Sequence, residues 1–188
     1  MTTPLTTPLT TPLTPPFADF RKKLHQYPEL SNAEMATAQK VLNQFAHFAP
    51  DEIHQNLGGT GIAFVFNSQH PTVGPTTLLR CELDALPIQE VNTFNHRSVN
   101  DGVSHKCGHD GHMAIVTAVG EKLMQTRPKT GRVILLFQPA EETGAGAIAV
   151  IADDKFKPLI PDYAFALHNI PGHALGHVFV KPGSFNQF

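Results

Sequence analysis

Residues 104–113, SHKCGHDGHM, concentrate side chains that bind metals or transfer protons. The stretch holds one of the chain's two cysteines and three of its eleven histidines. Cys107 and His109 stand two residues apart, so in extended backbone their side chains project to the same side. Gly108 and Gly111 allow the backbone to bend closely around a bound group. Because a thiolate and an imidazole suit zinc and other borderline divalent metals, the stretch predicts part of a metal site.

Further polar residues follow apolar segments elsewhere in the chain. Asp84 closes LLRCELD, Glu141 and Glu142 follow VILLFQPA, and His168 follows YAFAL. Adjacent glutamates at the end of an extended strand would point in opposite directions, so one could bind a metal while the other takes a proton from water. A bound metal lowers the pKa of water towards ~7, which makes that proton transfer feasible.

Two other interpretations of the same residues stay open. Cys107 could be the nucleophile of a thiol hydrolase, with His109 or His112 as its base, although the paired glutamates then have no role. The cluster could also be a polar loop with a buried thiol. His112, one turn into the following helix, is expected to support the site through packing or a hydrogen bond. His25, on an early helix, is interpreted as structural.

Helical and strand patterns alternate along the chain. Residues 17–27 and 31–48 have helical spacing, and Ser31 with Glu34 predicts a capping box for the second helix. A third helix is expected over 111–125, with Asp110 available to cap it, and a fourth over 144–156. Strands are expected over 60–67, 76–84, 131–142, 162–172 and 176–183. This alternation predicts an α/β fold, a three-layer sandwich around a largely parallel or mixed sheet, in which ligands bind at the carboxyl ends of the strands.

Composition narrows the class of protein. The chain has 188 residues, enough for one domain, and its formal net charge is −2. This charge and the absence of a basic stripe argue against nucleic acid or an anionic membrane as a partner. No apolar run reaches the ~18 residues that span a bilayer. Two cysteines are too few for a disulfide framework, which favours a reducing, cytoplasmic location. The repeat TTPLTTPLTTPLTPP within residues 1–16 predicts a flexible tail.

Five motifs occur in the order RKKLHQYPELS, LLRCELDALPI, KCGHDGHMA, ILLFQPAEETGAGA and FALHNIPG. Taken together, they resemble the metal-dependent amidohydrolases that include hippurate hydrolase, N-acyl-amino-acid deacylases, N-acetyl-diaminopimelate deacetylase and plant auxin-conjugate hydrolases. This is the cysteine-containing branch of the aminoacylase-like metallopeptidase superfamily. The resemblance covers residues 17 to about 185, and CGHDGH followed by QPAEE and LHNIPG is a specific combination.

The resemblance implies hydrolysis of a small N-acyl amino acid to a carboxylate and a free amino acid. It implies two divalent ions, manganese or zinc, bound by four side chains: Cys107, His109, Glu142 and His168. Glu141 would be the general base, and Asp84 would lie behind the metal ligands.

Two departures from the family accompany the resemblance. Cys81 and Glu82 stand where the family leads us to expect Ala and Asp. Family members are also much longer: a lid and dimerisation domain, then the rest of the catalytic domain with one more metal-binding histidine, follow the GHVFVKPG region. Residues 17–188 are therefore expected to be the N-terminal part of the catalytic domain, with impaired activity. The alternative is a non-catalytic fragment that still binds metal.

Overall fold

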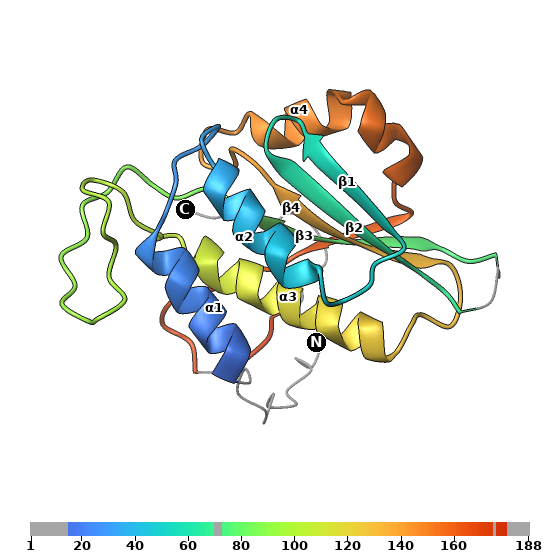
Figure 1. Cartoon of the computed structure of the whole chain (residues 1–188), viewed down its shortest axis with the longest axis horizontal. Helices are drawn as coiled ribbons and strands as arrows, with labels where there is room; N and C mark the ends of the chain where they lie inside the picture. The colour runs from blue at the N-terminus through green and yellow to red at the C-terminus, as the bar shows by residue number, and fades with distance from the viewer. Residues whose placement is uncertain (1–14, 70–72, 175, 180–188) are drawn as a thin grey trace, which may run out of the picture.

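A mixed five-stranded sheet forms the centre of the computed structural model, which describes residues 15–69, 73–174 and 176–179 (Figure 1). The strand order is β1-β2-β4-β3-β5. The strands are β1 (Glu52–Leu57), β2 (Gly61–Asn67), β3 (Thr76–Glu82), β4 (Arg132–Gln138) and β5 (Tyr163–Ala166). β2 runs antiparallel to both β1 and β4, whereas β3 runs parallel to β4 and β5. The expected mixed sheet is confirmed.

Helices cover both faces of this sheet, which gives the expected three layers (Figure 1). The helices of the first face are α1 (Pro15–Gln26), α2 (Met35–Phe45) and α3 (His109–Gln125). On the other face lie α4 (Gly146–Ala152) and the 3₁₀ helix η1 (Asp154–Leu159). In the described part of the chain, no helix combines the length and apolar character needed to cross a membrane.

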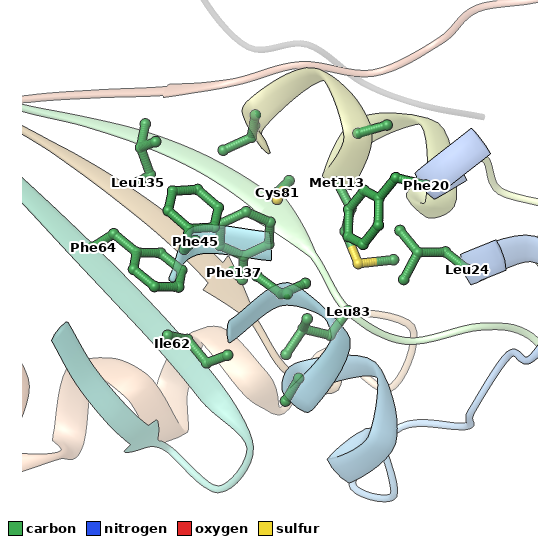
Figure 2. Packing of buried hydrophobic residues seen from close by; sticks show 14 of the residues in the cluster. Phe20, Leu24, Phe45, Ile62, Phe64, Cys81, Leu83, Met113, Leu135 and Phe137 are labelled. Carbon is green, nitrogen blue, oxygen red and sulfur yellow. The ribbon is translucent and has the colours of Figure 1, made fainter. Parts of the chain in front are cut away.

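The core has one apolar cluster on each face of the sheet. In the first cluster, the ring of Phe45 from α2 stacks on that of Phe64 from β2, with centroids 3.7 Å apart, and Phe137 from β4 packs edge-on against both (Figure 2). The second cluster joins β-strand residues to Val150 of α4 and Leu159 of η1. Because helices cover both faces, strands such as β2 are almost wholly apolar rather than alternating.

Helix α2 does not have the capping box that the sequence suggests. The hydroxyl of Ser31 donates instead to Asp84 Oδ2 at 2.6 Å, and the carboxylate of Glu34 is fully buried and accepts bonds from other segments. The amides of the first turn of α2 donate to Glu29, with Thr37 N at 2.6 Å. The expected capping box is therefore wrong because tertiary contacts claim both of its side chains.

The sequence misses one strand, and two further expectations concern the ends of the described part of the chain. β1 is not expected from the sequence, because its residues EIHQNL are polar and mostly exposed at the sheet edge. Residues 176–179 form no strand, and 180–183 lie outside the described residues. The proposed tail lies outside them too, except that α1 begins at Pro15, where two prolines suit a first helical turn.

The topology brings three strand ends to one edge of the sheet. β4, β3 and β5 are neighbours and parallel, so the segments that follow them leave the sheet on the same side. The long connection between β3 and α3, residues 83–108, extends from this edge (Figure 1). Side chains that follow the three strands can therefore meet there.

Candidate metal centre

The polar side chains that follow these strands converge with the start of α3. Cys107 Sγ lies 3.2 Å from His168 Nε2. Three sets of potential ligand atoms each lie within 4.8 Å of one another, and His109 belongs to all three. These sets are Cys107, His109 and His168; His109, Glu141 and Glu142; and Glu82, His109 and His112. Around His109 the structure thus gathers Cys107, His168, Glu141, Glu142 and His112, although no single set among the described residues contains all four suggested metal ligands.

His109 is the centre of the cluster and its ring is held in one orientation. The ring is buried, and Nδ1 lies 2.8 Å from the backbone oxygen of Asp84. Its Nε2 lies 3.7 Å from an oxygen of Glu141 and 3.7 Å from an oxygen of Glu142. Nε2 has no hydrogen-bond partner among the described residues. An imidazole fixed through one nitrogen, with the other facing carboxylates, is the arrangement of a typical metal-binding histidine.

Glu141 and Glu142 lie in a turn rather than at the end of an extended strand. β4 ends at Gln138, and Ala140 adopts a left-handed conformation with φ of 46°. The amide of Ala140 donates to the buried Glu34 carboxylate at 2.8 Å, which stabilises this bend. The expectation that the two glutamates point in opposite directions is wrong, because after the bend both carboxylates approach His109.

Asp84 lies behind the cluster and is fully buried. Its Oδ2 accepts hydrogen bonds from the Ser31 hydroxyl and from the amide of Glu142 at 3.0 Å. Its Oδ1 lies 3.5 Å from His109 Nδ1. Burial raises the pKa of this carboxyl, but the bonds from His109, Ser31 and Glu142 outweigh it and lower the pKa to about 2. Asp84 is therefore a fixed negative charge that orients both His109 and the Glu142 backbone.

Gly108 makes the close approach of Cys107 to His168 possible. Its φ is +97°, and it is the residue directly before α3. A Cβ atom here would lie 2.2 Å from Asn169 Oδ1, so both conformation and space require glycine. Two expectations from the sequence are wrong. The Cys107–His109 segment is bent rather than extended, and Gly111 lies inside α3, where the nearest atom to an added Cβ would be 4.0 Å away.

His112 joins two parts of the site that lie far apart in sequence. Its Nδ1 lies 2.8 Å from Glu82 Oε2, and its Nε2 lies 2.7 Å from Asn169 Oδ1. Glu82 also pairs with Arg80, whose guanidinium reaches within 3.8 Å of Glu141. Asn169 has no sequence signal, whereas Glu82 stands two residues before Asp84 at the same strand end. That spacing could have identified it.

The charges around Cys107 indicate the kind of ligand that the cluster fits. Burial, followed by the nearby carboxylates and first of all that of Glu142, raises the pKa of the Cys107 thiol to about 12. Burial and the neighbouring carboxylates raise the pKa of Glu142 as well, against the effect of His109. One oxygen of Glu142 is buried without a hydrogen-bond partner among the described residues. A divalent cation would satisfy this oxygen and His109 Nε2 and would favour the thiolate, so the donor set fits a metal.

Thiol, imidazole and carboxylate groups thus gather at the carboxyl ends of the parallel strands, which defines the chain as an α/β protein with a candidate metal centre. The comparison with known families agrees with this class. The chain belongs to Peptidase family M20/M25/M40, whose model matches residues 78–185.

Similar proteins support the same family. An N-acetyldiaminopimelate deacetylase of Anoxybacillus flavithermus is 35% identical over 167 residues, and a hippurate hydrolase of Campylobacter jejuni is 34% identical over 170 residues. Each match covers 89% of this chain but only 43% of the relative. The crystal structure of Bacillus subtilis YXEP, described as a dinuclear metal-binding peptidase of the M20 family, has a TM-score of 0.76 and 34% identity. This match covers 84% of this chain and 43% of YXEP. The chain thus spans less than half the length of these relatives.

Proposed function

We propose that this chain is the metal-binding part of an amidohydrolase that cleaves the amide bond of N-acyl amino acids. The observation that carries the proposal is His109 Nε2, a buried atom without a hydrogen-bond partner in the described chain that faces two carboxylates. The names of the relatives, which are deacetylases and hydrolases of N-acyl amino acids, support the substrate class.

In this proposal two divalent ions, manganese or zinc, bind to Cys107, His109, Glu142 and His168. Asp84 and His112 would hold the ligands in position, Asp84 through His109 and the amide of Glu142, and His112 through Glu82 and Asn169. When bound, such ions would polarise the amide carbonyl and acidify a water molecule.

Glu141 is the better candidate for proton transfer. Its side chain is 36% exposed, against 18% for that of Glu142, and no backbone bond ties it to Asp84. It can therefore reach both a water molecule and a substrate at the open side of the cluster. As water attacks the amide carbon, Glu141 would accept its proton and then deliver it to the leaving nitrogen as the C–N bond breaks.

The thiol-nucleophile alternative is disfavoured by the environment of Cys107. A thiol needs a lowered pKa and a base to attack a carbonyl group. Here burial and the surrounding carboxylates raise the pKa of the thiol to about 12. Both nitrogens of His112 already have partners. Of these two candidate bases only His109 keeps an unpaired nitrogen, and this Nε2 faces the carboxylates of Glu141 and Glu142.

We also propose that residues 17–188 correspond to the N-terminal part of a catalytic domain. Supporting this, the matches cover about 43% of the relatives. In addition, all four residues of the edge strand β5 are exposed, including Tyr163 and Phe165. On this view the isolated chain binds metal but turns over N-acyl amino acids poorly, because groups outside it would contribute to substrate clamping.

The experiment that tests the proposal separates the two glutamates. Purified wild-type chain, Glu141→Gln and Glu142→Gln are loaded with zinc or manganese, and the bound metal is measured by elemental analysis after desalting. We expect Glu142→Gln to lower metal content and Glu141→Gln to retain it. Glu52→Gln, a change on the exposed strand β1, is the matched control and should bind like wild type. The reverse pattern would refute the assignment of the two roles.

Turnover is measured on the same preparations by amino-acid release from N-acetyl and N-benzoyl amino acids. Any activity of the wild-type chain should fall by about 10² or more in Glu141→Gln, the scale of a lost general base. Metal binding with weak turnover that depends on Glu141 agrees with the proposal, whereas metal binding with no turnover at all would favour the non-catalytic alternative. Absence of metal binding by the wild-type chain would overturn the proposal as a whole.

A further inference from the structure

A buried carboxylate outside the candidate metal centre joins four segments of the chain. The side chain of Glu90, in the connection between β3 and α3, is only 2% exposed. It accepts bonds from Lys106 Nζ at 2.6 Å and from the amide of Ser98 at 2.6 Å. It also accepts a bond from Asn92 Nδ2 at 2.7 Å and lies 3.1 Å from His25 Nε2 in α1. One carboxylate thus ties the beginning, middle and end of this long connection to a helix.

His25 extends this set of contacts to the first turn of α3. Its second ring nitrogen, Nδ1, lies 2.9 Å from Asp110 Oδ2, which also accepts a bond from Arg21 Nε at 3.0 Å. The hydrogen bond to Asp110, assisted by Glu90 and opposed by burial, raises the pKa of His25. Both ring nitrogens of His25 therefore face buried carboxylates, which can only accept, so the ring links Glu90 to Asp110.

This series of charged groups, called here the anchoring chain, is Lys106–Glu90–His25–Asp110. Its two ends, Lys106 and Asp110, enclose the segment that holds Cys107 and His109. None of the four side chains belongs to a set of potential metal ligands in the described structure. The anchoring chain therefore contacts the metal-binding segment at its two ends, at the residue before Cys107 and at the residue after His109.

We propose that Glu90 and His25 are positioning residues that hold Cys107 and His109 at the separation needed for metal binding. The inference rests on the proposed metal site and adds a device to it. Gly108, between the two ligands, has φ of +97° and gives this segment little intrinsic rigidity, so contacts at its ends contribute to its shape together with the bond from His109 to Asp84. Contacts of this kind behind metal ligands typically change metal affinity by about 10- to 100-fold.

The test uses cobalt(II) as the probe, because a Cys–cobalt bond gives a charge-transfer absorption that reports ligand geometry without any turnover. The full chain is titrated with cobalt(II), and Cys107→Ser identifies the band, since the other cysteine, Cys81, is fully buried. Glu90→Gln removes the central negative charge. Lys106→Met removes one terminal contact from a side chain that is 27% exposed and so disturbs folding less. Leu159→Ala, in the second core cluster, is the control for general destabilisation.

We expect Glu90→Gln to bind cobalt(II) about 10- to 100-fold more weakly, with a shifted or weakened band, and Lys106→Met about tenfold more weakly. Leu159→Ala should lower the unfolding temperature and leave cobalt affinity within about twofold of wild type, because it is remote from the segment. If Glu90→Gln does not fold, Lys106→Met carries the test.

Two results would overturn the inference, and they are distinguishable. If both anchoring variants bind cobalt(II) with wild-type affinity and band shape while only their thermal stability changes, the anchoring chain is merely structural and the metal site stands. If the wild-type chain itself gives no Cys107-dependent band, the metal site fails and the inference fails with it.

Discussion

Gly108 and Gly111 flank His109 and Asp110, yet alanine should have opposite effects at the two positions. Gly108 has φ of +97°, and a Cβ there would lie 2.2 Å from the side-chain oxygen of Asn169. Gly111 lies inside α3, and the nearest atom to a Cβ there, Arg21 Nε, is 4.0 Å away. The pair therefore compares a required glycine with a replaceable one in the same helix start.

The cost at Gly108 has two parts. An alanine held at positive φ costs about 1–2 kcal/mol. The Asn169 amide must also move, which breaks its 2.7 Å contact with His112 Nε2. A lost hydrogen bond of this kind is worth about 1 kcal/mol. The free energy of unfolding should therefore fall by about 2–3 kcal/mol in Gly108→Ala. Gly111→Ala should instead gain about 0.5–1 kcal/mol, because alanine is the better helix former.

Urea unfolding followed by far-UV circular dichroism measures both variants on the same scale. The double variant Gly108→Ala/Asn169→Ala separates the two parts, because it removes the clash but keeps the backbone strain. The double variant should lose less stability than the sum of the two single changes. Equal stability of Gly108→Ala and Gly111→Ala would refute the reasoning, because it would mean that neither the conformation nor the contact with Asn169 matters.

Three other predictions concern buried carboxylates and the isolated chain. Glu34→Gln should lower the free energy of unfolding in urea by about 1 kcal/mol or less, because its amide oxygen can still accept from the Asn32 and Ala140 amides. Glu34→Ala leaves both donors unsatisfied and should lower it by about 3 kcal/mol. Burial raises the pKa of Glu90, but hydrogen bonds, first that from Lys106, outweigh it and hold the pKa well below its usual 4.5. This carboxylate therefore stabilises the fold above about pH 4.5 and loses that effect as the pH falls, so the unfolding temperature of Glu90→Gln should depend less on acid than that of wild type. Finally, the 188-residue chain should show little turnover of N-acyl amino acids even with added manganese or zinc. The measurement is an amino-acid release assay with a full-length relative as positive control. Robust turnover that Glu141→Gln abolishes would contradict this prediction.

The sequence is a good guide to the sheet and to the residues of the site. The apolar runs of β2, β3 and β4 are unambiguous because helices cover both faces of the sheet, so burial leaves a continuous signal. Polar residues that directly follow such runs must lie at a strand end, and parallel neighbours place those ends together. These two rules are enough to predict that Asp84, the glutamate pair and His168 meet Cys107 and His109.

The local geometry is less predictable, because long-range contacts decide it. Nothing near Ala140 in the sequence indicates a left-handed bend, since the carboxylate that accepts its amide is Glu34, 106 residues earlier in the chain. The Ser31 capping box fails for the same reason: Asp84, on another segment, competes for the hydroxyl. Patterns within a few residues cannot report these partners.

The same distinction explains why His25 looks like an isolated structural residue in the sequence. Its two partners, Glu90 and Asp110, lie 65 and 85 residues away, and each alone would look like a solvated charge. Burying any one of these three groups without a partner would carry a large desolvation cost. They therefore contact one another and form a single series with Lys106. That series ends on both sides of the Cys107–His109 segment. Cys107 and His109 can be identified in the sequence by their chemistry, whereas the residues that we propose to position them can be identified only from the fold.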